Sequence, residues 1–505
     1  MSFSFWIIIF LLLNLIHALG TWKLYKKAGF SPIFSAIPFY NLYIALKIIR
    51  RPWWWIFLYY IPVVNNVMII VLWVELVKSF GKQKKSDSYI VVFTLGLYLF
   101  YLNYFEDVKY VSENNTSTKS DSGDWVSAIV FAIVAATIIR TFSFEAYTIP
   151  TSSMEKSMMV GDFLFVSKMS YGTRIPMTQF TLPLLHDTVP VLGIPAYVKG
   201  PELPYWRLPK ISDIKNNDIV VFNYPMVDAP VDKKTNYIKR CIAIAGDSLE
   251  IKHGSVYVNG KEAALPDGSH GQFMHIVKLK KGTKIRKDIL IERYDITDPI
   301  MGDYNNPDIM YMNLTHDKVE KLKSITNIES IIQYENKPGS KDKGIFPDTK
   351  EWNADNFGPI YVPKQGVTVE LNSESLPFYE RVIKVYEAND LKVEGDKIFI
   401  NGELASSYTF KQNYYWMMGD NRHNSLDSRY WGYVPEDHVV GKPTFVWMSI
   451  NQYASGLDKF RWERIMTGIS DQGKINDHKI LVAILIILSI IANYFLKKRK
   501  LKKSI

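Results

Sequence analysis

Two serines beside an apolar stretch could supply a nucleophile. Ser152 and Ser153 lie in the run Tyr147–Met154 (YTIPTSSM), which directly follows an apolar segment. A serine hydroxyl is a weak nucleophile unless a neighbouring base takes its proton. Serine is also common in loops, so this cluster alone is weak evidence. A base from another part of the chain is needed before the run predicts chemistry.

The best candidate for that base is Lys239, in the run Tyr237–Asp247 (YIKRCIAIAGD). A lysine can act as a base near neutral pH when burial lowers its pKa by a few units and leaves the amine neutral. The alternative is a lysine on an edge strand whose amine reaches solvent. On this run alone, the alternative is the better interpretation.

Two other side chains were weighed for catalysis. No histidine lies in an obvious partner motif, and the best candidate is His423, which is close to Asp420 and Asp427 in sequence. The single cysteine, Cys241, excludes an intrachain disulfide and could be a nucleophile. Because it lies in a strongly apolar run, we interpret it as buried filler of a strand.

A third segment, Met417–Gly432 (MMGDNRHNSLDSRYWG), is dense in polar side chains between two apolar ends. Such a composition usually indicates a polar loop. Here the apolar ends would hold the cluster in place. The arrangement suits a hydrogen-bonded shell that orients a catalytic amine.

Together these segments resemble the motifs of bacterial type I signal peptidases (leader peptidases), a family of Ser/Lys serine proteases. Four motifs occur in the family's order behind an apolar span, at 149–162, 217–225, 237–247 and 419–432. The resemblance implies a mainly β extracytoplasmic catalytic domain with an inserted subdomain. The apolar runs of the sequence predict that this domain is attached to an α-helical, multi-span membrane region.

The resemblance implies a role for each matching residue. Ser153 is the implied nucleophile and Lys239 the implied general base. Thr151 and the Ser153 N–H are the implied oxyanion hole. The implied supporting residues are Ser425, which would hydrogen-bond the lysine, and the pair Asp427 and Arg429. The positions that match pocket residues for small substrate side chains are Ile149, Met154, Leu164, Val221, Tyr237 and Ile238.

Three positions depart from the family's usual pattern without removing a catalytic group. Lys156 stands where a proline is common, and Ser152 stands where a glycine is common. Thr151 replaces the more usual serine but keeps its hydroxyl. The regions 1–110 and 265–390 fall outside the common family core, and their roles stay open.

The implied activity is a membrane-bound endopeptidase that removes N-terminal signal peptides from translocated precursors and cleaves after small residues through an acyl-enzyme. We expect no cofactor and no metal, since no spacing such as His-Glu-x-x-His is present. Expected partners are signal peptides and membrane lipid, with the translocation machinery as a candidate. The expected location is the bacterial plasma (inner) membrane, multi-pass, with the catalytic domain on the outer, periplasmic face.

Charge and hydropathy fit a membrane protein better than a nucleic-acid-binding one. The net charge is +10, and much of the basic excess lies beside apolar runs. Basic residues at such places usually set membrane orientation. No base-stacking stripe or binding module is visible, so we expect no nucleic-acid partner.

The apolar and polar stretches predict an order of parts along the 505 residues. They are an N-terminal membrane region with several apolar spans (1–110), a polar linker (111–124), a membrane anchor (125–144), the first part of the catalytic core (145–264), an insertion or accessory subdomain (265–390), the second part of the core (391–475), a C-terminal membrane span (480–496) and a basic cytoplasmic tail (497–505). The N-terminal region repeats an Ile-Pro-x-x-Asn motif, at Ile37–Asn41 and Ile61–Asn65. Two Asn-Gly pairs, at 259–260 and 401–402, predict hairpins.

Two questions stay open at this point. If Ser88–Phe105 crosses the membrane, the basic loop 78–85 faces outward, against the charge rule. Two other protein classes also compete with the signal peptidase interpretation. A self-cleaving repressor-type Ser/Lys protease would be soluble and would carry a DNA-binding domain. A catalytically inactive membrane scaffold would not need the Ser153, Lys239 and Ser425 set, and the repeat could be an interaction module.

Overall fold

A computed structural model describes residues 3–111, 121–200, 202–470 and 472–477, and a few positions between 484 and 491. The chain forms two compact units. The first is Met1–Ser143 with Arg174–Arg207, and the second is Phe144–Thr173 with Leu208–Ile505. Most of the predicted linker and C-terminal span, and the whole basic tail, lie outside the described residues.

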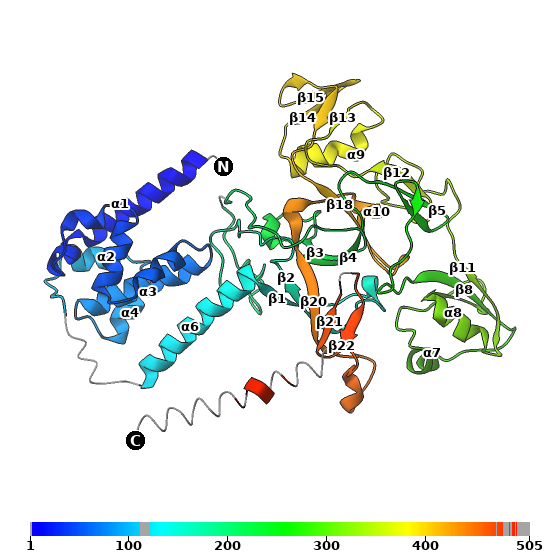
Figure 1. Cartoon of the computed structure of the whole chain (residues 1–505), viewed down its shortest axis with the longest axis horizontal. Helices are drawn as coiled ribbons and strands as arrows, with labels where there is room; N and C mark the ends of the chain where they lie inside the picture. The colour runs from blue at the N-terminus through cyan, green and yellow to red at the C-terminus, as the bar shows by residue number, and fades with distance from the viewer. Residues whose placement is uncertain are drawn as a thin grey trace. The chain divides into compact units, whose positions relative to one another are not determined.

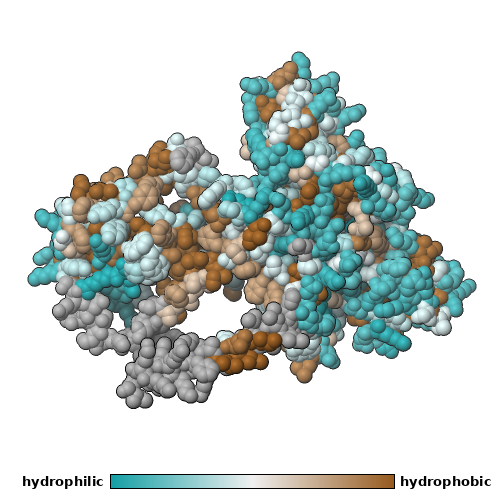
Figure 2. Space-filling view, viewed as in Figure 1, coloured by the Kyte–Doolittle hydropathy of each residue, from teal (hydrophilic) through white to brown (hydrophobic). Residues whose placement is uncertain are grey.

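The first unit is helical and largely apolar (Figures 1 and 2). Its α-helices are α1 (Phe3–Lys27), α2 (Tyr40–Ile48), α3 (Val64–Ser79), α4 (Lys85–Phe93), α5 (Tyr98–Tyr104) and α6 (Asp121–Phe142), with 3₁₀ turns η1 (Pro32–Ser35) and η2 (Trp53–Tyr59). Within the described ranges, one helical segment, Ser4–Lys27, is long and apolar enough to cross a membrane. The apolar part of α6, Ala128–Phe142, is shorter. The structure thus shows one candidate span, and the expected multi-span arrangement is not shown.

The repeated Ile-Pro-x-x-Asn motif forms the same turn twice. Phe39 and Val63, the third residue of each copy, adopt φ values of 64° and 71° just before α2 and α3. In both copies the asparagine N–H donates to the carbonyl of the isoleucine four residues earlier. Left-handed backbone is unusual for bulky or β-branched residues. The sequence repeat is therefore also a structural repeat that starts a helix.

The second unit is built on a mainly antiparallel sheet with the order β1-β2-β20-β3-β4-β18-β19, extended by β21 and β22. The strands are β1 (Phe144–Thr148), β2 (Asp162–Ser167), β3 (Ile219–Asn223), β4 (Asn236–Ala243), β18 (Tyr414–Met418), β19 (Val434–Pro435), β20 (Val439–Ser449), β21 (Thr467–Ile469) and β22 (Ile475–Asp477). In β3 and β18 every residue is buried, so these strands form the centre of the unit.

Smaller sheets surround this centre. They contain β5 (Ser248–Lys252), β6 (Ser255–Val258), β7 (Lys261–Glu262), β12 (Phe357–Tyr361), β13 (Thr368–Glu370), β14 (Leu391–Glu394), β15 (Lys397–Ile400), β16 (Glu403–Leu404) and β17 (Ser407–Thr409). The predicted Asn-Gly hairpins are confirmed as β6–β7 and β15–β16. All four turn residues have positive φ, as the tight two-residue turn requires.

Part of the predicted insertion forms a lobe of its own in this unit (Figure 1). It contains the sheet β11-β8-β10-β9. Its elements are β8 (Phe273–Leu279), α7 (Lys287–Tyr294), β9 (Met301–Gly302), β10 (Ile309–Leu314), α8 (His316–Lys323) and β11 (Ile328–Gln333). A separate apolar cluster fills this lobe. The later part of 265–390 pairs with strands outside it, because β12 joins β5 and β13 joins β17.

Candidate active site

Lys239 lies in the interior of the main sheet. Its strand β4 pairs with β3 on one side and β18 on the other. The side chain is only 3 % exposed, and its Nζ lies 2.6 Å from Ser153 Oγ. The amine also donates to the Ile238 carbonyl at 3.0 Å. The edge-strand interpretation of Lys239 is therefore wrong.

Burial changes the acid–base behaviour of this amine. Removal from water disfavours the ammonium form and lowers the pKa of Lys239 from 10.5 to about 8, while the charges of Asp427 and Asp420 oppose part of this effect. With a pKa of about 8, roughly a tenth of the amine is neutral at pH 7. An ordinary lysine would be almost wholly charged there.

Ser153 lies in a single 3₁₀ turn, η3 (Ser152–Met154), between β1 and β2. The turn is held by the loop after β18. The Asn421 N–H donates to the Ser153 carbonyl at 3.1 Å, and Asn421 Nδ2 donates to the Ser152 carbonyl at 3.1 Å. Asn424 Nδ2 donates to Ser152 Oγ at 2.9 Å. The serine and the lysine, 86 positions apart, thus meet where two loops and a strand converge.

Asp427 and Arg429 form a buried ion pair in this loop. The Arg429 Nε and Nη2 donate to the two carboxylate oxygens at 2.9 and 2.8 Å. Burial alone would raise the pKa of Asp427, but the neighbouring guanidinium holds it below its ordinary value. Asp427 also accepts from the Gly419 N–H at 3.1 Å. The pair therefore fixes both ends of the polar loop.

Two other predicted residues lie near the serine without the contacts that the resemblance implies. The buried Ser425 Oγ has no hydrogen-bond partner of ordinary geometry among the described residues, and it does not bond to Lys239. A β-carbon added at Gly419 would lie 2.3 Å from Ser425 Oγ and 2.5 Å from the Ser153 carbonyl oxygen, so the two serines approach the same point. Thr151 is exposed directly before η3.

The six predicted pocket positions fall into neighbouring apolar clusters. Ile149, Met154 and Leu164 pack together, with Ile238 against them. Ile238 also packs against the cluster that contains Val221, whereas Tyr237 packs against a third cluster. Because the first three side chains and Val221 are buried, only Tyr237 and Ile238 expose appreciable surface here.

One buried ion pair beside Lys239 was not assigned a role from the sequence. Arg240 donates from Nε and Nη2 to the two oxygens of Asp420, at 2.8 and 2.6 Å, and both side chains have no exposed surface. Ser157 Oγ donates to the same carboxylate at 2.5 Å. The sequence feature that could have revealed this pair is Arg240, a second charge directly after Lys239 in an apolar strand. Consecutive side chains of a strand point to opposite faces, so Arg240 lies on the face of the sheet opposite Lys239.

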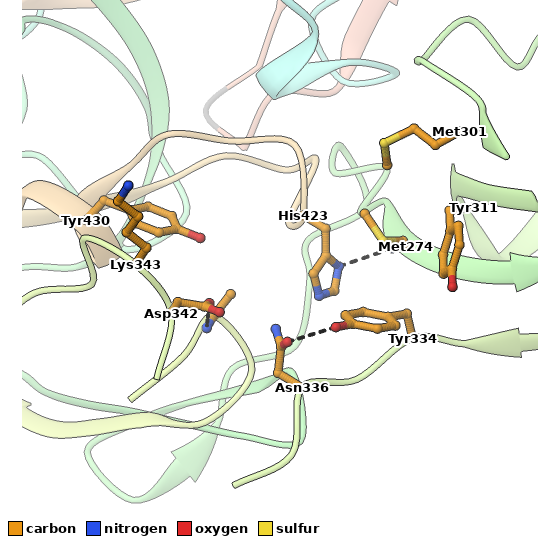
Figure 3. A pocket seen from close by; sticks show the side chains of 10 residues that line it. Met274, Met301, Tyr311, Tyr334, Asn336, Asp342, Lys343, His423 and Tyr430 are labelled. Carbon is orange, nitrogen blue, oxygen red and sulfur yellow. Dashed lines mark hydrogen bonds between the residues drawn. The ribbon is translucent and has the colours of Figure 1, made fainter. Parts of the chain in front are cut away.

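His423 lines a cavity of about 560 Å³ (Figure 3). Its Nδ1 accepts from the Met274 N–H at 3.1 Å, and its Nε2 donates to Asp355 Oδ1 at 2.9 Å. Tyr311 and Tyr334 form part of the cavity wall. Both ring nitrogens are thus engaged by Met274 and Asp355, whereas the Ser153 hydroxyl contacts Lys239, which removes His423 as the candidate base.

Cys241 is fully buried in β4, as predicted for filler. Burial raises the pKa of its thiol, which suppresses the reactive thiolate form. This residue is therefore structural.

Comparisons with known proteins show which families the chain is similar to. The model of the family described as "Signal peptidase, peptidase S26" matches residues 122–303 and 364–448. A model described as "Family of unknown function (DUF5684)" matches residues 33–113. The second match falls in the region that lies outside the common core and contains the Ile-Pro-x-x-Asn repeat.

Curated relatives carry the same family name. Signal peptidase I of Buchnera aphidicola subsp. Schizaphis graminum is 25 % identical over 337 residues, covering 63 % of this chain and 74 % of the relative. Signal peptidase I of Helicobacter pylori strain 26695 is 24 % identical over 375 residues, covering 70 % and 93 %. The Haemophilus influenzae enzyme is 22 % identical over 355 residues, covering 69 % and 76 %. Since the family model matches more than half of its length, this chain belongs to the signal peptidase family, the S26 serine endopeptidases.

Proposed function

We propose that Ser153 is the nucleophile and Lys239 the general base with which this chain removes signal peptides from translocated precursors. The observation that carries the proposal is the 2.6 Å contact between Lys239 Nζ and Ser153 Oγ, made by an amine whose pKa is lowered to about 8. A neutral amine at this distance can accept the hydroxyl proton as the oxygen attacks. The intact pair also disfavours a catalytically inactive scaffold.

The reaction proceeds through an acyl-enzyme. Ser153 attacks the carbonyl that follows a small residue, and the proton taken by Lys239 is passed to the leaving amine. Water, activated by the same amine, then releases the signal peptide from Ser153. The proposed oxyanion donors are the hydroxyl of Thr151, an exposed residue directly before η3, and the backbone N–H of Ser153 within η3. Asp427, Arg429 and Ser425 support the loop that faces the pair.

Substrate side chains are proposed to enter over the clusters that contain Ile149, Val221 and Ile238, with Met154, Leu164 and Tyr237 beside them. Small residues beside the scissile bond are the proposed fit to these apolar side chains. The proposed substrates are signal peptides of secreted precursors, with membrane lipid around the anchor and the translocation machinery as a further partner. No nucleic acid is part of this proposal.

The proposed location is the bacterial plasma membrane, with several spans and the β-rich unit on the outer face. The apolar residues exposed along α1 support insertion of this helix, since exposed apolar surface of that length is costly in water. Helix α6 ends at Phe142, shortly before the strand that leads to Ser153. An inserted α6 would keep Ser153 near the bilayer surface, where signal peptides emerge.

The test is cleavage of a precursor by purified full-length protein in detergent. Ser153→Ala and Lys239→Ala should each lower the cleavage rate by about a thousandfold or more, because each removes one member of the reacting pair. Lys252→Ala, which changes an exposed lysine on β5, should leave the rate unchanged. Appreciable cleavage by a folded Ser153→Ala protein would rule out this nucleophile.

A further inference from the structure

The departure at Lys156 has a structural partner in the lobe formed by β8–β11. Lys156 follows the nucleophile by three residues and has a φ of 70°. Its Nζ donates to Asp295 Oδ2 at 2.9 Å and to Thr297 Oγ1 at 3.1 Å. Both partners follow α7, the first helix of the lobe. A proline at 156 could make neither contact.

Two further hydrogen bonds, made by Thr297 and Asp298, connect this contact to the segments around the serine. Thr297 Oγ1 donates to Glu155 Oε1 at 3.1 Å, so the hydroxyl links positions 155 and 156. Asp298, only 5 % exposed, accepts a hydrogen bond from Asn421 Nδ2. We call Asp295, Thr297 and Asp298 the 295–298 clamp.

The clamp reaches the nucleophile through Asn421. One amide proton of Asn421 goes to the Ser152 carbonyl and the other to Asp298, while its backbone N–H goes to the Ser153 carbonyl. Among the residues that the structure describes, Asn421 Oδ1 is buried without a hydrogen-bond partner, and the amide N–H groups donate to these acceptors. A hydrogen bond to a buried carboxylate is stronger than one between neutral groups. Asp298 is therefore placed to hold the amide that holds the serine turn.

We propose that the 295–298 clamp is a positioning element of the active site, which holds the turn carrying Ser153 against Lys239. This inference rests on the proposed role of Ser153. The clamp supplies no reacting group. It fixes the distance between Ser153 Oγ and Lys239 Nζ. A displacement of about 1 Å at such a contact can lower the reaction rate about a hundredfold. The lobe formed by β8–β11 thus contributes to catalysis by positioning Ser153, although it lies far from this serine in sequence.

The first test changes Asp298. Asp298→Asn keeps the shape of the side chain but removes its charge, and should lower kcat about tenfold. Asp298→Ala should lower kcat about a hundredfold. In both variants KM should stay within about twofold, because the clamp acts on the serine turn and not on bound substrate. Asp298→Glu, which restores the carboxylate, should recover part of kcat. The unfolding temperature of each full-length variant in detergent reports whether it is folded.

The second test uses the outer contact of the clamp, where the Asp295 side chain is 51 % exposed. Lys156→Met and Asp295→Asn should each lower kcat severalfold. The double variant should lose less than the product of the two single losses, because both substitutions remove the Lys156–Asp295 contact, although Lys156 also contacts Thr297 and Asp295 also contacts Lys318. The matched control is the exposed ion pair Lys278–Glu329 of the same lobe, 2.6 Å long with side chains 46 % and 47 % exposed. Lys278→Met should leave kcat and KM unchanged.

The outcomes separate this inference from the proposed function. If Ser153→Ala is inactive while Asp298→Ala and Lys156→Met both keep kcat within twofold, the clamp does not position the serine and the inference is wrong. If KM rises and kcat holds, the segment contacts substrate, which also overturns it. If Ser153→Ala remains active, the proposed nucleophile fails regardless of the clamp.

Discussion

The base and the nucleophile of this site are held in different ways. Lys239 sits on β4, whose backbone is hydrogen-bonded to a neighbouring strand on each side. Ser153 sits on a three-residue 3₁₀ turn whose position depends on side chains and backbone groups from distant segments. A strand ladder is cooperative and insensitive to any one side chain, whereas a short turn is only as firm as its contacts. Small changes around the turn should therefore matter more than small changes along β4.

The largest effect is expected from a methyl group added at Gly419, directly after β18, where the chain approaches the turn that carries Ser153. At Gly419 an added β-carbon would lie 2.3 Å from Ser425 Oγ and 2.5 Å from the Ser153 carbonyl oxygen, so Gly419→Ala must move Gly419 and the turn apart. We expect cleavage to fall about a hundredfold, since the Oγ–Nζ contact is lost while β4 stays in place. Gly302→Ala on β9, where the added carbon meets open space, is the matched control. If Gly419→Ala and Gly302→Ala cleave the precursor at equal rates, the cleavage rate does not depend on a tightly held Ser153 turn.

The pH dependence of the cleavage rate tests the Lys239 side of the comparison. The amine must be neutral to take the serine proton, so the rate should rise with pH and level off above the pKa of about 8. Below that pH the rate should fall about tenfold per pH unit. The measurement is a pH–rate profile of kcat with one model precursor. A profile that keeps rising toward pH 10.5, as for an exposed lysine, would mean that the amine is not buried during catalysis.

The smallest expected effect is on stability and has the opposite sign from the effect on activity. Moving the pKa of Lys239 from 10.5 to about 8 corresponds to about 3 kcal/mol of destabilisation at pH 7, because the unfolded chain binds the proton that the folded site disfavours. Lys239→Met should therefore be inactive yet more stable at pH 7, by up to about 3 kcal/mol. The gain should shrink as pH rises from 8 and vanish near 10.5.

Denaturant unfolding of the full-length protein in detergent, at pH 7 and at pH 10, would measure this gain. Ser153→Ala serves as the reference, because it removes the hydroxyl and keeps the amine. An unchanged midpoint for Lys239→Met at both pH values would show that burial of the amine costs the fold little.

Some features of the fold could be predicted from the sequence because their physical cause lies in neighbouring residues. The Asn-Gly pairs predicted two hairpins because few residues tolerate the positive φ of a tight turn, and both hairpins are present. The apolar run around Cys241 predicted a buried strand. The order of the four motifs indicated the family and named Ser153 and Lys239 as the residues to compare in space.

Tertiary structure decided which of these residues touch. The 2.6 Å contact of Ser153 with Lys239 and the contact of Asp298 with Asn421 each join segments more than 80 positions apart. It also paired both ring nitrogens of His423 with Met274 and Asp355, and left Ser425 without the expected bond to the lysine. Lys156 was an unexplained departure in the sequence, and its contact with Asp295 became visible only in the tertiary structure. Turn and strand preferences depend on neighbouring residues and can be read along the chain, whereas the burial that lowers a pKa depends on everything the fold packs around the group.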